Sequence, residues 1–158
     1  MAFNIETAEV IWKWNRVYRG LGSKAEAFSR YFVEDIRNCN LPATKVEITQ
    51  LKVGFLFGGK REYLEISAEH LADFRIFLGA RAYGTHLSLS KFLVIKPGIL
   101  GGKKTSFNTF ELQDLGDYLA SAQTSLDAAL RKVAQESGLD PKELNLTFDP
   151  LALNKHIG

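Results

Sequence analysis

Cysteine is almost absent from this chain of 158 residues, which contains only Cys39. A single cysteine excludes an intrachain disulfide and a cysteine-rich zinc site. No apolar run approaches the length of a membrane span, and residues 1–6 lack the basic and apolar regions of a secretory signal. These absences predict a cytoplasmic protein without a transmembrane segment that folds around its own apolar core.

Neither sign of charge dominates the chain. Lysine and arginine number 20 against 18 acidic residues, which gives a formal net charge of +2. A charge this small neither attracts nor repels nucleic acid or an anionic membrane, so such a preference must come from local clusters. Apolar residues make up 46% of the chain and charged residues 24%, which is the balance of a globular protein. Length and composition together predict one domain over residues 1–158.

The motifs of common enzymes are missing as well. The sequence has no Gly-x-Ser-x-Gly elbow, no His-Glu-x-x-His, no Walker phosphate loop and no Gly-x-Gly-x-x-Gly. Its histidines, His70, His86 and His156, are far apart in sequence and have no carboxylate at ligand spacing. We therefore predict no metal, no cofactor and no catalytic residue. An enzyme of unrecognised type stays an alternative, because a missing motif is weak evidence.

Two segments near the start have apolar residues at helical spacing. Residues 7–19 place Trp14 and its apolar neighbours on one side and leave Lys13 on the other, which predicts a first helix. In the second segment, residues 23–38, Ser23 and Glu26 match a capping box. The sequence thus predicts two N-terminal helices.

A third apolar stripe predicts a long C-terminal helix over residues 108–137. Asn108 and Glu111 match a capping box at its start, and Gly138 follows its end. Gly116 lies inside the segment, where glycine is about 1 kcal/mol less favourable than alanine. We expect the helix either to break at Gly116 or to pack closely against a neighbour there.

Between the helical segments the pattern changes to the alternation of half-buried strands. The glycines at 58–59 suit a two-residue hairpin turn, which would pair Leu51 with Ile66. Val46 is one step out of phase with Leu51, so this register requires a β-bulge near residues 49–50.

A second hairpin turns at Gly84-Thr85, where glycine suits the first central position of a type II′ turn. Tyr83 then faces His86, and counting inward gives one apolar face, on which Leu78 beside Lys91 is the single mismatch. That face is the predicted core face. The reverse face is mixed in character and partly open to water.

The reverse face carries the strongest candidate site, namely Arg75, Arg81, Tyr83, His86 and Ser88. Arginine offers a planar fork to phosphate, and aromatic rings offer faces on which bases stack. We expect these residues to converge on a ligand. The alternative is an ordinary solvent-facing sheet, on which scattered aromatic side chains are normal.

A second candidate consists of two segments in which paired glycines precede paired cations: Lys60 and Arg61 in one, Lys103 and Lys104 in the other. Glycine lets backbone amides approach a phosphate or an anionic lipid headgroup, and the cations supply charge. The alternative is that both segments are ordinary soluble loop tips.

The sequence predicts an α+β domain with two N-terminal helices, an antiparallel sheet of four or five strands, and a long C-terminal helix packed on one sheet face. Residues 103–107 would supply the fifth strand. We expect a non-enzymatic binding module for a protein partner or a small ligand, which uses the reverse sheet face or the cavity between helix and sheet. Nucleic-acid or phosphate binding through Arg75, Arg81 and the basic glycine segments is the alternative. No ligand identity or oligomeric state is predicted.

Overall fold

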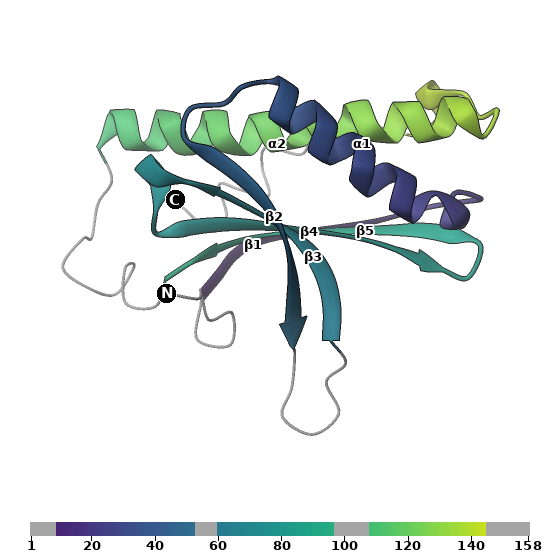
Figure 1. Ribbon diagram of the computed structural model, residues 1–158, viewed down its shortest axis with the longest axis horizontal. Helices are drawn as coiled ribbons and strands as arrows, with labels where there is room; N and C mark the ends of the chain where they lie inside the picture. Colours follow the sequence, from purple (N-terminus) through teal and green to yellow (C-terminus); the bar gives the residue numbers. More distant parts are fainter. Residues whose placement is uncertain (1–8, 53–59, 97–107, 145–158) are drawn as a thin grey trace.

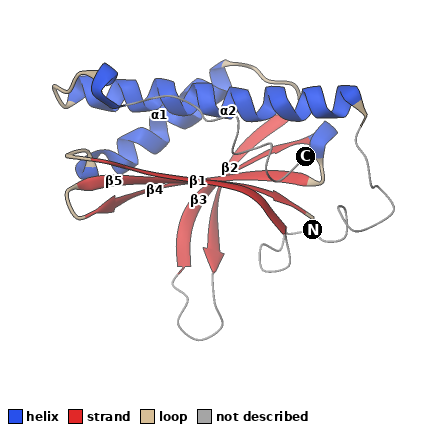
Figure 2. Cartoon of the chain, turned by 180° about the vertical axis from the view of Figure 1, so that it is seen from behind, coloured by secondary structure: helices blue, strands red, loops and turns tan. Residues whose placement is uncertain are grey.

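The computed structural model describes residues 9–52, 60–96 and 108–144, and it contains one antiparallel sheet with both helices on the same face (Figure 1, Figure 2). The α+β class, the antiparallel sheet and the long C-terminal helix are confirmed. The elements in chain order are β1 (Glu9–Tyr18), η1 (Gly22–Lys24), α1 (Ala25–Asn38), β2 (Thr44–Lys52), β3 (Lys60–Ala68), η2 (Glu69–Leu71), β4 (Phe74–Tyr83), β5 (His86–Ile95), α2 (Thr109–Glu136) and η3 (Pro141–Leu144).

The strands lie in the order β1-β5-β4-β3-β2, so the first strand pairs with the last and the sheet ends at β1 and β2. All four pairings are antiparallel. The sheet twists strongly, and the lower ends of β2 and β3 extend away from the helices (Figure 1). None of the helices in the described part of the chain is long and apolar enough to cross a membrane.

The prediction of a first helix over residues 7–19 is wrong, because this segment forms strand β1. Its register shifts between Val10 and Trp12, so Ile11 forms a bulge. Trp12 then pairs with Leu93 of β5 and points to the helix-covered face. The bulge interrupts the alternation of apolar and polar residues that is typical of a strand. The apolar residues of this segment therefore fall at a spacing that is typical of a helix. Between Glu9 and β2, the structure therefore has one α-helix.

Helix α1 begins two residues later than predicted and without the predicted capping box. Ser23 lies inside the short 3₁₀ helix η1, and Lys24 at the N-cap of α1 makes no side-chain capping bond. The turn η1 contacts the tip of the second hairpin, where the amide of Gly22 donates to the carbonyl oxygen of Thr85 at 2.9 Å. A Cβ atom on Gly22 would lie 2.8 Å from the carbonyl carbon of Thr85, so this approach requires glycine.

The predicted register of the first hairpin is also wrong. Strand β2 pairs with β3 so that Val46 opposes Ile66 and Leu51 opposes Arg61, without a bulge in β2. A two-residue turn at 58–59 cannot place Lys52 opposite Lys60, and the glycines themselves lie outside the described residues. Because the true register differs by an odd number of residues, Leu51 lies on the sheet face opposite to the helices.

The second hairpin has the predicted register throughout. Tyr83 opposes His86, and Leu78 opposes Lys91. Gly84 has a φ of +61°, a left-handed conformation that glycine adopts without a steric penalty. Pairing the strands residue by residue therefore predicted both faces of this hairpin.

The main core lies between the sheet and the two helices. Its largest fully buried apolar side chains include Phe28 and Phe32 of α1 and Ile76 of β4. A smaller apolar cluster lies on the reverse face, where Phe77 is 1% exposed and Val94 is 0% exposed. Part of the face that was expected to be wet is therefore dry.

Helix α2 begins with the predicted capping box, in which Asn108 Oδ1 accepts from the amide of Glu111 at 2.9 Å. It continues unbroken through Gly116, around which a Cβ atom would meet nothing within 4 Å. Neither expectation for Gly116, a break or close packing, holds. The predicted strand at 103–107 lies outside the described residues, and β1 is the fifth strand.

Candidate functional site

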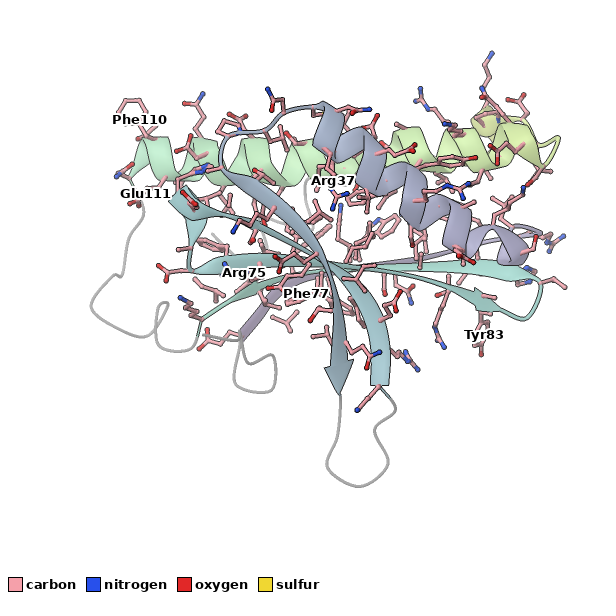
Figure 3. All side chains as sticks on the ribbon, in the orientation of Figure 1. Arg37, Arg75, Phe77, Tyr83, Phe110 and Glu111 are labelled. Atoms are coloured by element: carbon pink, nitrogen blue, oxygen red, sulfur yellow. The ribbon has the colours of Figure 1, made fainter. Side chains whose placement is uncertain are left out.

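The predicted site on the reverse face is spread along the whole length of one hairpin. Arg75 is the second residue of β4 and Tyr83 is the last. Eight residues of strand span roughly 26 Å, at about 3.3 Å per residue. Figure 3 shows the two side chains at opposite ends of the sheet. The fold brings Arg81, Tyr83, His86 and Ser88 together at the hairpin tip, whereas Arg75 lies apart from them.

Arg75 is engaged by neighbouring groups of the fold. Its Nε atom lies 3.3 Å from Glu65 Oε1, and its Nη1 atom donates to the carbonyl oxygens of Ala72 at 2.8 Å and Phe74 at 2.7 Å. These contacts tie the start of β4 to β3 and to the preceding turn. A phosphate would have to compete with them for the guanidinium group.

At the hairpin tip, Arg81, Tyr83, His86 and Ser88 form what we name the tip patch. The guanidinium carbon of Arg81 lies 5.5 Å from the ring centroid of Tyr83, and Tyr83 is 61% exposed. Tyr83 points away from the helices (Figure 3). His86 Nδ1 is buried and makes no hydrogen bond within the described residues. The patch offers one stacked cation–aromatic pair to a partner.

The structure describes one of the two basic segments that were predicted to bind anions. Lys60 and Arg61 are exposed at the start of β3, beside the end of β2. Lys103 and Lys104 lie outside the described residues. The two basic segments therefore stay a prediction.

Lys91 occupies the space between the sheet and α2, where a ligand cavity was expected. The side chain is 1% exposed. Its Nζ atom donates to Gln123 Oε1, and Gln123 Nε2 in turn donates to Asp127 Oδ1 at 3.0 Å. The same Nζ atom lies 4.8 Å from the ring centroid of Trp12 and 5.6 Å from that of Trp14. We name these five residues the buried lysine cluster. Their side chains occupy the space in which a ligand cavity was expected.

Burial shifts the pKa values of Lys91 and Asp127 in opposite directions. Removal from water lowers the pKa of Lys91 to about 7, against the opposing attraction of Asp127. Burial also raises the pKa of Asp127, while the hydrogen bond from Gln123 and the charge of Lys91 act in the opposite direction. Lys91 therefore titrates near neutral pH. Its mismatch with Leu78 was visible in the sequence, but its tryptophan neighbours were not, because β1 was read as a helix.

A groove of about 660 Å³ lies between α1 and the two strands β2 and β3. Its apolar floor consists of Val33, Val46, Ile48 and Leu64, and its rim consists of Glu26, Ser29, Arg30, Glu34, Arg37, Glu47 and Glu62. Ile48 is 68% exposed, which is a large exposure for an isoleucine in a sheet. The correct β2 register was needed to find this groove, since it places Ile48 opposite Leu64.

The groove rim carries charges of both signs. Arg37 lies between α1 and the sheet (Figure 3), and its Nη2 atom donates to the carbonyl oxygen of Val46 at 3.4 Å. The guanidinium carbon of Arg30 lies 5.2 Å from the ring centroid of Tyr31. Glu26, Glu34, Glu47 and Glu62 outnumber these two arginines, so the rim has an excess of negative charge.

Two smaller hollows have a different character. One of about 150 Å³ is lined in part by His70, Asp114 and Asp117, and one of about 520 Å³ is lined in part by Arg16 and Arg19. Within the described segments, no three histidine, cysteine or acidic residues are grouped so that they could hold a metal ion. The larger hollow also lies at a sheet edge and includes Val17, which is 52% exposed, but its strand β1 carries a bulge whereas β2 does not.

The chain matches no protein-family model, no curated protein and no solved structure. Its own geometry is therefore the guide to function. Lys91 is sealed inside the core, and the tip patch offers one exposed pair. The groove combines exposed apolar surface, an excess of glutamates over arginines and an edge strand without a bulge, and it is the best candidate site.

Proposed function

We propose that this chain is a non-enzymatic binding module that takes a segment of a protein partner in the groove between α1 and strands β2 and β3. The observation that carries the proposal is Ile48, which is 68% exposed on an edge strand at the floor of that groove. An exposed apolar side chain on a sheet edge invites association, so folded proteins normally cover or remove it.

The arrangement of the groove suits a protein segment. Its four apolar residues form the centre, and charged or polar side chains surround them. An apolar centre inside a charged rim is the usual anatomy of a protein interface.

Selection from a library of short peptides displayed on phage tests this function without assuming the partner. We expect enriched peptides to shift the backbone amide signals of Val33, Ile48 and Leu64 in two-dimensional NMR spectra. The substitution Ile48→Asp places a charge at the groove floor and should weaken binding by at least about tenfold, as expected for an interface anchor.

Val17→Asp is the matched control for that experiment. Val17 is 52% exposed on β1, the opposite edge strand, and is therefore similar in type and exposure but lies outside the groove. Its substitution should leave peptide binding unchanged. The proposal is wrong if no peptide is enriched over the Ile48→Asp protein, or if the shifted amides belong to the tip patch.

A further inference from the structure

We propose that the segment bound in the groove is extended and basic: it adds a strand to the edge of β2 and places lysine or arginine side chains against Glu26, Glu34 and Glu62. This inference rests on the proposed function and specifies the chemistry of the partner. It follows from the backbone of β2, the apolar floor and the charges of the rim, in that order.

The backbone of β2 is suited to pairing with another strand. It is the last strand of the described sheet and pairs with β3 in an unbroken register from Thr44 opposite Ala68 to Lys52 opposite Lys60. Every second residue of such an edge strand directs its N–H and C=O groups away from the sheet. The opposite edge, β1, has a bulge between Val10 and Trp12, which is a known protection against further pairing.

The apolar floor lies where the side chains of an added strand would fall. Val46 and Ile48 alternate on the helix-facing side of β2, and Leu64 lies opposite Ile48 on β3. A strand added to β2 would lie about 4.8 Å from it, as neighbouring strands do. Its helix-facing side chains would then cover Ile48 and approach Val33 of α1.

The rim supplies negative charge on the same side of the sheet. Glu26 and Glu34 come from α1, and Glu62 lies on the helix-facing side of β3 because it alternates in phase with Leu64. With Glu47, these residues make four glutamates in the groove lining against two arginines, which contact Tyr31 and Val46, so the rim has an excess of negative charge. A basic segment complements this charge, whereas an acidic segment would be repelled.

A second copy of this chain is a poorer occupant of the edge. Pairing β2 with itself across a two-fold axis would bring Glu26, Glu34 and Glu62 of both copies to one junction. Like charges gathered there oppose association. The charge pattern therefore favours a partner with a different sequence.

Fluorescence anisotropy with three labelled synthetic peptides tests the inference. The first has the sequence Lys-Thr-Val-Thr-Val-Thr-Lys, which places valine and lysine on one face of a strand. The second has glutamate in place of both lysines, and the third keeps the lysines but has N-methylated backbone amides that cannot pair with β2. We expect the first peptide to bind, more weakly as salt rises, and the other two to bind at least about tenfold more weakly.

Variants of the protein test whether the charges of the rim glutamates, and not a change in fold, determine peptide binding. The triple substitution of Glu26, Glu34 and Glu62 by glutamine should weaken the lysine peptide about tenfold and remove most of its salt dependence. Glu69→Gln is the matched control, because Glu69 is exposed on η2 outside the groove and should not affect binding. Circular dichroism shows whether each variant keeps its fold.

Several outcomes overturn the inference. These are no binding of the lysine peptide, equal binding of the glutamate or N-methylated peptide, or a dimer that Ile48→Asp dissociates. If phage selection yields groove-binding peptides without basic residues, the inference fails while the proposed function stands. If selection yields no groove-binding peptide, both fail.

Discussion

Lys91 is buried in the core, with its Nζ atom close to the rings of Trp12 and Trp14. Lysine is rarely buried without partners, because removing an ammonium group from water is unfavourable. Here the hydrogen bond to Gln123 and the faces of Trp12 and Trp14 offset part of that penalty. The depressed pKa, about 7, shows that the offset is incomplete.

Tryptophan fluorescence should report the protonation of Lys91 directly. Trp12 and Trp14 are the only two tryptophans of the chain, and both rings lie close to Lys91 Nζ. We expect their emission to change with pH around a midpoint of about 7 in the folded protein, and this change to vanish in Lys91→Met. A flat fluorescence profile from pH 6 to 9 in the unsubstituted protein would contradict the assignment.

The lowered pKa of Lys91 should make the free energy of unfolding increase with pH. The folded pKa of about 7 lies below the ordinary value of 10.5, so between these values the unfolded chain binds more protons. The free energy of unfolding should therefore rise from pH 7 to 9, with a slope of up to about 1.4 kcal/mol per pH unit. Asp127 is the facing carboxylate, and burial raises its pKa while the hydrogen bond from Gln123 and the charge of Lys91 act in the opposite direction. Burial raises the pKa of Tyr18 to about 12, above this pH range. Urea unfolding should show this slope, and Lys91→Met should flatten it.

Two glycines should respond to alanine in opposite directions. Gly116 is exposed in α2 with open space around it, so Gly116→Ala should stabilise the protein by up to about 1 kcal/mol. A Cβ atom on Gly79 would lie 2.6 Å from the Tyr63 ring and 2.8 Å from Ser90 Oγ, so Gly79→Ala should destabilise it. Thermal unfolding of both variants measures the signs, and a stabilised Gly79→Ala protein would show that the reverse face is loosely packed.

At the scale of elements, the helices and strands differ in how much of them could be predicted. The start of α2 was predictable because its signal is local: the side chain of Asn108 and the backbone of Glu111 meet within one turn. Strand β1 was not predictable in the same way. The bulge at Ile11 interrupts its alternation, and its pairing partner, β5, follows about seventy residues later along the chain.

The two hairpins show the same contrast. The β4–β5 hairpin has a tight turn at Gly84, which fixes the register within its own sequence. For β2 and β3, the alternating apolar residues allow more than one register. The incorrect register placed Leu51 on the face of Ile66 and did not pair Ile48 with Leu64, so the groove floor was not predicted.

The capping box should contribute measurably to the stability of α2. Asn108→Ala removes the acceptor for the amide of Glu111 and should lower the free energy of unfolding by about 1 kcal/mol. Asn108→Asp retains the acceptor and should lie close to the unsubstituted protein. Chemical denaturation of the two variants makes the comparison, and equal losses in both would mean that capping is not the cause.

At the scale of the whole molecule, the layered α+β architecture was predictable from patterns, but the groove was not. Periodicity indicates which elements are present, and the apolar faces require helices to cover a sheet. The groove depends instead on where α1 crosses the sheet relative to β2, which no local signal specifies. For the same reason, the sequence placed Arg75 with the tip patch, although strand length separates them.

Among the described residues, the β2 edge of the sheet lies beside a groove with an apolar floor and an excess of glutamates at its rim. Helices α1 and α2 cover the same face (Figure 2), and α1 forms one wall of the groove next to β2. The buried lysine cluster lies between the sheet and α2, so binding at the β2 edge need not disturb it. The proposed binding site and the buried lysine cluster thus lie in different parts of the molecule.

Hydrogen–deuterium exchange by NMR, with and without a peptide selected on phage, tests the central claim most directly. An added strand would protect the amides of Thr44–Lys52 that point away from β3, which are the edge amides of the described sheet. We predict slower exchange at these alternate positions and unchanged exchange between Tyr83 and His86. Unchanged exchange along β2, or new protection confined to the tip patch, would contradict the account.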